Sequence, residues 1–222
     1  KRKGKQKTPT TKHKITNQNL DGFVYIHPLG IYLAKERNLN NETWNSSIDK
    51  IYNQGIIVAE QRAEMSTPFE FMTGLIYVLD NKNIPDLPNK ERTRFLNDIL
   101  GLKNVYHGNH LNARFRDEVV ETAVIKDGKL VWRQEPLDDC LKKNCYADLR
   151  KINSQGLFTT ESVKQEYVKG ETAYFWNPVN GTVAGFDAVQ VGVLLLWGRN
   201  PEYSFTSLGV RLVVRPQAME IK

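Results

Sequence analysis

The chain has 222 residues, 40% of them hydrophobic, which is enough for one domain with its own core. Its formal net charge of +6 is unevenly distributed, because residues 1–14 carry seven lysines and arginines and no acid, which leaves −1 for the rest. No stretch is long and apolar enough to span a membrane, and no signal peptide opens the sequence. Cytoplasmic, cell-surface and virion-associated locations all remain open.

The first fourteen residues form a basic tail that contains no apolar residue to bury. On its own such a tail is expected to be disordered, or to be ordered by a partner or by packing on its own domain. One interpretation is a contact with nucleic acid or another acidic surface. The other is a solvated terminus or a remnant of a longer protein. Any nucleic-acid binding is expected through this tail alone.

The next segments predict a β-hairpin and a helix. Residues 20–37 read as two strands joined at His27-Pro28-Leu29-Gly30, where proline and glycine favour a turn. Apolar residues then recur at helical spacing from Trp44 to Tyr52, and Gly55 is placed to end the helix. Asn40 or Asn41 is the expected cap at its start.

The clearest local signal is Thr67-Pro68-Phe69-Glu70. It combines a capping hydroxyl, a proline at the first helical position and a glutamate three residues after the threonine, which is a capping box. The helix should continue through Leu79. A third helix is predicted from about Asn89 to Leu100, after a proline and before Gly101.

Strand patterns dominate the second half. A hairpin is predicted over residues 118–132, with Asp127-Gly128 as its turn. Residues 134–165 are polar and irregular, with a short helix expected at 160–167. Two further strands follow an aromatic segment at 170–181. The order of strands, two or three helices and strands predicts an α+β domain with the helices packed on antiparallel sheets.

The run from Thr182 to Arg215 is predicted as strand–turn–strand with two unlike faces. The orderly face holds Ala184, Phe186 and Ala188, then Val191, Val193 and Leu195. The opposite face holds Gly185, Asp187 and Val189, then Gly192, Leu194 and Leu196, which share no chemical property. A strand with one buried face and one solvent-exposed face normally has polar residues on the exposed face. The pattern therefore indicates either a binding surface on a regular scaffold or strands that bury both faces.

Four features occur in an order typical of one known family. They are the hairpin residues 22–26, the helix opening at 65–71, the aromatic strand Tyr174-Phe175-Trp176, and the ending at 207–215. This order is similar to the formylglycine-generating-enzyme type of C-type lectin fold. Within that fold, Val183-Ala184-x-Phe186-x-Ala188 followed by Leu208-Gly209-Val210-Arg211 most resembles the variable proteins of diversity-generating retroelements. The match covers most of residues 20–215, with 86–165 weakly anchored.

The resemblance implies a lectin-like domain over residues 15–222, with a variable region at about 183–215, in a bacterial, archaeal or viral system. In that family a reverse transcriptase mutates adenines, so codons of the AAC or AAT type diversify but never yield Trp, Met, Lys, Gln or Glu. The residues expected to vary and to contact ligand are Gly185, Asp187, Val189, Gly192, Leu194, Leu196, Gly198, Arg199, Asn200, Tyr203, Ser204, Phe205 and Thr206. Gln190, Trp197 and Glu202 would be fixed neighbours. Leu208, Gly209 and Arg211 would hold the fold.

The resemblance also implies a hypervariable, receptor-like protein that binds a macromolecular ligand, a protein or a glycan, without chemistry and without a cofactor. The alternative is an oxidase of the formylglycine-generating type. Those enzymes bind copper through cysteines late in the chain, whereas residues 170–222 here contain no cysteine. We therefore expect no enzymatic activity.

Three other patterns have two interpretations each. His107-Gly-Asn-His110 has a spacing that suits a metal, yet histidines beside Gly-Asn are also typical of a solvated turn. Cys140 and Cys145 fit a small disulfide loop or two free thiols. Acceptor sequences at Asn41, Asn45 and Asn180 matter only in a eukaryotic secretory pathway.

Overall fold

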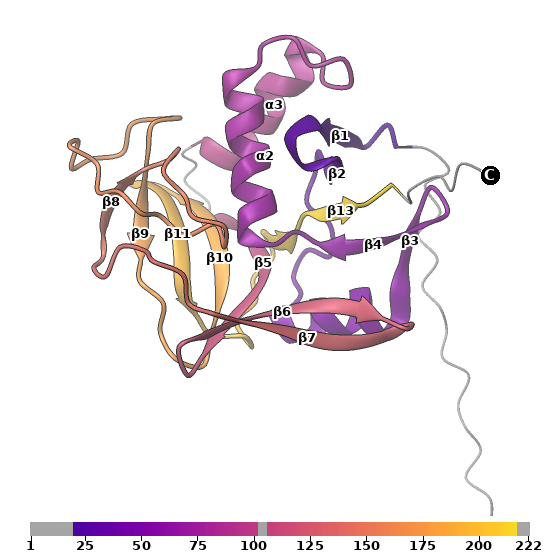
Figure 1. The fold of residues 1–222 in the computed structure, drawn as a ribbon. Helices are drawn as coiled ribbons and strands as arrows, with labels where there is room; N and C mark the ends of the chain where they lie inside the picture. The colour runs from indigo at the N-terminus through magenta and orange to yellow at the C-terminus, as the bar shows by residue number, and fades with distance from the viewer. Residues whose placement is uncertain (1–19, 102–105, 217–222) are drawn as a thin grey trace, which may run out of the picture.

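The structure is a computed structural model that describes residues 20–101 and 106–216. Within these ranges the chain is mixed α+β, as the order of sequence patterns predicts, with three α-helices and two largely antiparallel sheets. Figure 1 shows the two sheets on either side of helix α2 (Pro68–Asp80). The basic tail, residues 1–14, lies outside the described residues.

The first sheet has five strands in the order β1-β2-β13-β4-β3, all paired antiparallel. They are β1 (Phe23–Ile26), β2 (Ile31–Ala34), β13 (Leu212–Val214), β4 (Gln61–Met65) and β3 (Ile56–Val58). The predicted hairpin is confirmed, and Gly30 adopts the left-handed conformation that its turn requires, at φ 63°. The short strands β3 and β4 were not predicted.

The second sheet follows the order β7-β6-β5-β10-β11-β9-β8, with β12 beside β5. Its strands are β5 (His107–Arg116), β6 (Val119–Lys126), β7 (Lys129–Pro136), β8 (Cys145–Asp148), β9 (Thr172–Trp176), β10 (Thr182–Val189), β11 (Gly192–Arg199) and β12 (Leu208–Val210). Strands β9 and β11 are parallel, as are β5 and β12. The predicted hairpin around Asp127-Gly128 is confirmed as β6 and β7. The short helix predicted at 160–167 is wrong, because this segment is an irregular loop that bridges to β8.

The other predicted helices are present. The Thr67 side chain accepts from the backbone N–H of Glu70, and the Glu70 carboxylate accepts from the Thr67 N–H, which confirms the capping box of α2. Helix α3 (Asn89–Leu100) follows Pro88 and ends at Gly101. No helix in the described ranges is long and apolar enough to cross a membrane.

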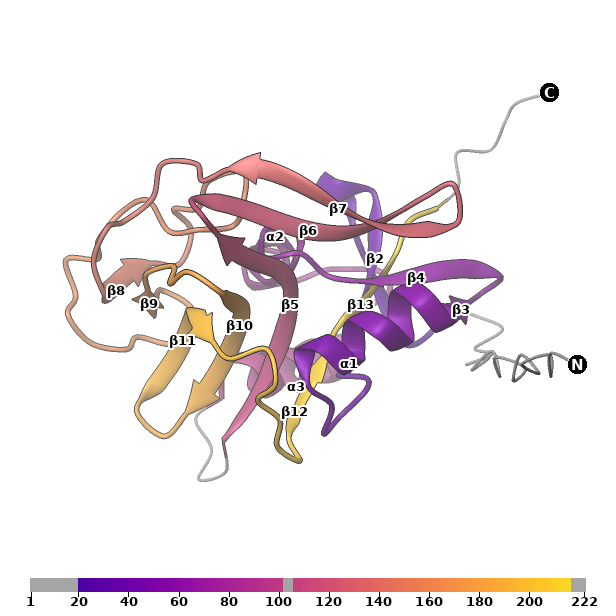
Figure 2. The same ribbon diagram turned by 90° about the horizontal axis from the view of Figure 1, so that it is seen from below.

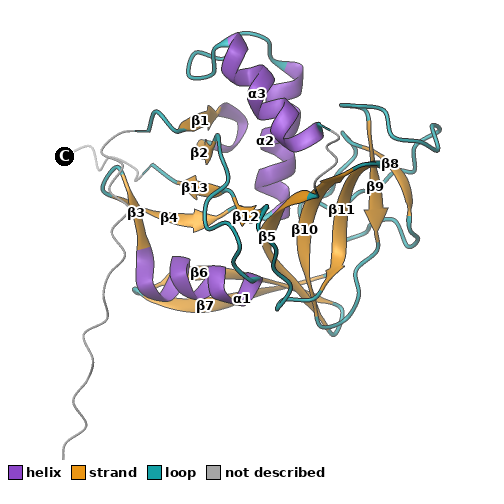
Figure 3. Ribbon diagram, turned by 180° about the vertical axis from the view of Figure 1, so that it is seen from behind, coloured by secondary structure: helices purple, strands orange, loops and turns teal. Residues whose placement is uncertain are grey.

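Helix α1 (Trp44–Ile48) continues as a π-helical segment (Asp49–Gly55). Its cap is Thr43, whose hydroxyl accepts from the Ser46 N–H at 3.0 Å. The prediction of Asn40 or Asn41 as the cap is wrong, because both precede the cap and Asn41 lies in a turn at φ 65°. Figure 3 shows this helix beside β6 and β7, where Trp44 stacks on Trp132 with ring centroids 5.8 Å apart.

The main core lies between α2 and the inner face of the second sheet. Phe71 of α2 contacts Phe186 of β10, with ring centroids 5.1 Å apart, and both side chains are buried. A second cluster of buried residues joins α1 and its π-helical extension to the first sheet and β6. The main core thus covers one face of both β10 and β11.

Candidate ligand-binding surface

The inner face of β10 and β11 agrees with the period-2 prediction. Ala184, Phe186 and Ala188 are at most 2% exposed, and Val193 and Leu195 are fully buried. Val191 was predicted to share this face, and that is wrong. It lies in the turn between the strands and is 74% exposed.

Strand register defines the outer face of the sheet. Leu194 lies between Tyr174 of β9 and Asp187 of β10, and Leu196 lies between Trp176 and Gly185. Tyr146 of β8 pairs with Tyr174 and extends the first of these rows. Since directly paired residues share a face, these residues form one row across four strands and a second row across three.

The side of the outer face nearer to β8 is partly open. We call the five side chains Tyr146, Tyr174, Trp176, Leu194 and Leu196 the apolar patch. Trp176 is 45% exposed, and the other four are half-buried. The aromatic members contact one another edge-on, with centroids 5.1 Å apart for Tyr146 and Tyr174 and 6.4 Å for Tyr174 and Trp176. Large aromatic and aliphatic side chains are therefore presented side by side on a rigid sheet.

The side nearer to β5 is closed, contrary to the prediction of an exposed face. Asp187 is fully buried and Arg199 is 5% exposed. Their side chains form an ion pair, and the Tyr106 hydroxyl donates to the same carboxylate. We call Tyr106, His110, Asp187 and Arg199 the buried polar cluster.

A β-bulge explains how Arg199 reaches this cluster. Val183 pairs with Arg199 and Gly185 pairs with Leu196, so two residues of β11, Trp197 and Gly198, face one residue of β10. The extra residue turns Arg199 to the outer face, beside Gly185. Trp197 keeps its place in the core and is fully buried.

Two segments distant in sequence cover the cluster. Figure 2 shows the connection from β11 to β12 passing close to the start of α1. The backbone N–H of Trp44 donates to the Pro201 carbonyl at 3.0 Å, and the N–H of Asn41 donates to the Leu208 carbonyl at 2.9 Å. Phe205 packs edge-on against Tyr106, with centroids 4.3 Å apart. Burial of the outer face here is thus a tertiary effect that the strand pattern does not encode.

His110 is neutral within the cluster. Its Nε2–H donates to the Glu42 carbonyl at 3.2 Å, so Nδ1 is free to accept from Nη1 of Arg199 at 3.4 Å. Burial, reinforced by the Arg199 charge, lowers the pKa of His110 to about 3. Burial also raises the pKa of Asp187, and the Arg199 guanidinium opposes this shift. The Tyr106 pKa is raised by burial and by the Asp187 carboxylate, so its hydroxyl remains a donor.

Glycines provide the space for the ion pair. A Cβ on Gly185 would lie 2.5 Å from Cζ of Arg199 and overlap the guanidinium. A Cβ on Gly108 would lie 2.9 Å from Cγ of Asp187. Gly185 therefore has a steric role in this molecule, in addition to any role as a variable position.

The remaining residues expected to contact ligand divide by exposure. Exposed are Gly198, Asn200, Tyr203, Ser204 and Thr206; half-buried are Val189 and Phe205; and Gly192 is buried. The expected fixed neighbours Gln190 and Glu202 are exposed as well. Gly192 lies against Tyr167, whose Cβ would be 3.1 Å from an added Cβ. The expectation of a surface position is thus wrong for Gly185, Asp187, Gly192 and Arg199. The expectation of ligand contact stays a prediction for the exposed and half-buried residues.

The sequence prediction missed the aromatic part of the patch. Tyr174 and Trp176 alternate with the core residue Phe175, which is a usable period-2 signal. Tyr146 lies in a segment predicted to be irregular, and only its pairing with Tyr174 brings it to the patch.

The other patterns do not produce a site. His107 and His110 lie buried on β5, not in a solvated turn, and Nε2 of His107 is 2.7 Å from the Asp98 carbonyl. Within residues 20–101 and 106–216, no three His, Cys, Asp or Glu side chains gather as a metal site. Cys140 and Cys145 are both free and buried.

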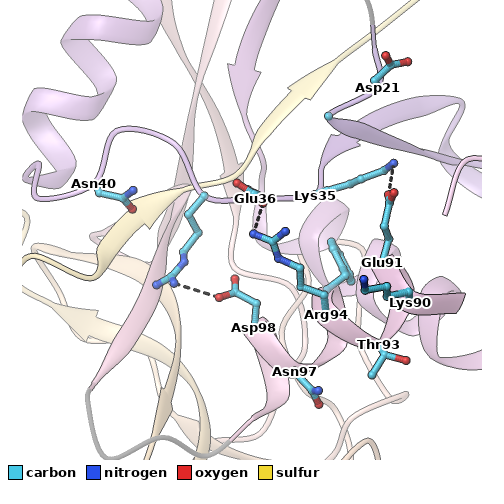
Figure 4. Close-up of a pocket in the computed structure, with 13 residues that line it drawn as sticks. Asp21, Lys35, Glu36, Asn40, Lys90, Glu91, Thr93, Arg94, Asn97 and Asp98 are labelled. Carbon is cyan, nitrogen blue, oxygen red and sulfur yellow. Dashed lines mark hydrogen bonds and ion pairs between the residues drawn. The ribbon is translucent and has the colours of Figure 1, made fainter. Parts of the chain in front are cut away.

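A cavity of about 880 Å³ lies between the loop after β2 and helix α3 (Figure 4). Six of its charged side chains pair across the cleft: Lys35 with Glu91 at 2.8 Å, Arg37 with Asp98 at 3.1 Å, and Arg94 with Glu36 at 2.6 Å. These pairs tie the loop to the helix and compensate one another.

Comparison of the chain with protein-family models, curated proteins and solved structures found no match in any of the three.

Proposed function

We propose that this protein is a receptor-like variable protein of a diversity-generating retroelement with a C-type lectin fold. It binds a macromolecular ligand through the apolar patch and the loop 200–206, and performs no chemistry on it. The α+β architecture is compatible with this fold, and the partly open face formed by part of the expected variable run supports the proposal.

One observation carries the proposal. The inner face of β10 and β11 is apolar and buried, whereas the outer face mixes large side chains with glycines and remains partly open. Trp176 is 45% exposed and Tyr203 is 50% exposed. Aromatic side chains on rigid elements bury much area at little entropic cost, so they act as anchors in binding surfaces.

The patch favours a protein ligand over a glycan. Its five side chains include no formal charge and two aliphatic leucines, which suit apolar side chains of a partner better than sugar hydroxyls. Among the described residues the two cysteines are buried and no metal cluster forms, so no observation favours the oxidase alternative.

The DNA beside the gene tests the proposed origin. We expect a near-copy of the region coding for residues 183–215 that differs only at adenines, next to a reverse-transcriptase gene. Differences scattered over all four bases, or a flank without any copy, would reject the retroelement origin.

Binding capacity is tested by display of the full chain. Positions 194, 196, 200, 203, 204 and 206 are varied with the residues that mutated AAC codons encode, and the library is panned against lysozyme. A matched library varies six exposed positions on β6, β7 and their turn, which are Lys126, Asp127, Lys129, Arg133, Gln134 and Pro136. We expect specific binders from the first library only. Equal yields from both libraries would show that this face has no special role.

A further inference from the structure

Three residues of the expected variable run contact one another below the surface. Asp187 and Arg199 form an ion pair that is almost completely shielded from solvent, and the guanidinium occupies the space above Gly185. We infer that Gly185, Asp187 and Arg199 form one coupled unit, which positions the loop 200–207 and whose members tolerate change only together. The inference rests on the proposed function in taking these three codons to be diversified.

The first argument for coupling is electrostatic. A buried charge without a partner is strongly destabilising, whereas joint replacement of a buried pair by apolar residues is often neutral. Asp187 is 0% exposed and Arg199 is 5% exposed, so solvent cannot replace either partner. Change at one position therefore leaves an uncompensated charge at the other.

The second argument is steric. Any side chain at Gly185 would overlap the Arg199 guanidinium, because its Cβ would lie only 2.5 Å from Cζ. The bulge at Trp197 and Gly198 fixes the path of β11 at this point, so the arginine cannot simply move along the strand. A larger residue at 185 thus displaces the guanidinium from its ion pair with Asp187, unless residue 199 is smaller as well.

The positioning role follows from Tyr106. Its hydroxyl donates to the Asp187 carboxylate, its ring packs against Phe205, and its carbonyl accepts from the Ser207 hydroxyl. Phe205 in turn contacts the exposed Tyr203, with centroids 5.5 Å apart. Arg199 is the last residue of β11 and also donates to the Asn109 carbonyl at 3.3 Å. Both ends of the loop are therefore tied to the buried polar cluster.

The coupling divides the variable run into two classes. Leu194 and Leu196 are half-buried, Tyr203 is exposed, and none of the three carries a charge. A change at any one of them therefore leaves no buried charge unpaired, so they are free to vary one at a time. Gly185, Asp187 and Arg199 are restricted to compatible sets. The diversity available to the surface is accordingly smaller than the number of mutable codons suggests.

Two display libraries of the full chain test the coupling without any ligand. One varies 185, 187 and 199, and the other varies 194, 196 and 203, both with the residues that mutated AAC codons encode. Each library is selected for protease resistance and sequenced. In the surface library we expect most combinations to survive with independent residue frequencies. In the library that varies 185, 187 and 199 we expect few survivors. Among them, an acid at 187 should occur together with arginine at 199, and an apolar residue at 187 together with an apolar residue at 199.

Independent frequencies with equal survival in the two libraries would overturn the coupling. This outcome is distinct from failure of the proposed function, because folding is selected and binding is not. A protein that passes this test and never binds a ligand would refute the function and leave the coupling intact.

Purified variants test the positioning role. Asp187→Leu and Arg199→Leu alone should each lower Tm by about 10 °C, and the double variant should recover most of that loss. In the double variant, hydrogen exchange of the loop 200–207 amides should be several-fold faster while that of β10 is unchanged. The pair Leu194→Ser/Leu196→Ser is the matched control and should leave loop exchange unaltered. Unchanged loop protection in the double variant would overturn the positioning role.

Discussion

Nη1 of Arg199 lies 3.4 Å from Nδ1 of His110, beneath the closed side of the second sheet. Since the other ring nitrogen donates to the Glu42 carbonyl, this contact is available only to the neutral imidazole. A second proton on the ring would point an N–H group at a guanidinium. The cluster thus selects one protonation state of His110.

The first prediction concerns the pH dependence of stability. The His110 pKa falls from about 6.5 in the unfolded chain to about 3 in the folded protein. The unfolded state therefore binds more protons between these values, and stability falls by up to about 1.4 kcal/mol per pH unit as pH drops below 6.5. Between pH 7.5 and pH 5, urea unfolding of the wild type should lose about 2 kcal/mol from this residue.

The variant His110→Gln should not show this part of the loss in unfolding free energy at low pH. The matched control is His27→Gln, because His27 is exposed and lies outside the buried polar cluster. Parallel profiles for wild type and His110→Gln would contradict the prediction.

The second prediction separates the two faces of β11. Leu195 is fully buried and its neighbours Leu194 and Leu196 are half-buried. Leu195→Ser should reduce the free energy of unfolding by about 3–5 kcal/mol, from lost transfer energy, a cavity and a buried hydroxyl. Leu194→Ser and Leu196→Ser should each cost about 1 kcal/mol or less. Equal losses at all three positions in urea unfolding would mean that the apolar patch belongs to the core.

Local chemistry explains why some elements were predictable. Four residues, Thr67 to Glu70, specify the start of α2, and both reciprocal hydrogen bonds of the capping box are present. Proline and glycine likewise marked the first hairpin. By contrast, the strands β3 and β4 are short, and Gln61–Met65 mixes polar with apolar residues. They pair with each other, but β4 joins the rest of the sheet only through β13 from the far end of the chain.

The candidate site was predictable only in part, for a related reason. Period-2 patterning correctly assigned Asp187 to the face opposite Phe186, but it carries no information about what covers that face. The covering segments are the loop before β12 and the region around Glu42, which are distant from Asp187 in sequence. The bulge that turns Arg199 outward is likewise visible only in the strand register.

The third prediction compares two glycines that share a left-handed conformation. Gly156 has φ 80°, and a Cβ there would lie 2.8 Å from Cα of Phe69, at the start of α2. Gly128 has φ 73° and open space around it. Gly128→Ala should cost about 1 kcal/mol from backbone strain alone, whereas Gly156→Ala should cost about 3 kcal/mol or more. Similar Tm values for the two variants would contradict the steric argument.

The fourth prediction concerns Arg211, which is fully buried between β12 and β13. Its guanidinium donates to the Ala34 carbonyl at 3.0 Å, pairs with Asp98 and lies over the Phe95 ring at 4.9 Å. Arg211→Ala should lower the free energy of unfolding by about 3–5 kcal/mol, because it leaves buried acceptors unpaired. Arg37→Ala is the control. Its side chain also pairs with Asp98 but is half-buried, so about 1 kcal/mol is expected. Equal losses of unfolding free energy in the two variants would show that burial of the arginine does not determine its contribution to stability.

The short stretch from Leu208 to Val214 belongs to both sheets, since β12 pairs with β5 and β13 is the middle strand of the first sheet. During translation, β2 and β4 consequently emerge from the ribosome long before the strand that joins them. Until then their unpaired edges are open to aggregation. Under the proposed mutagenesis, codons ending in a pyrimidine never become stop codons. Every diversified chain is then translated through β13, the strand that joins β2 to β4.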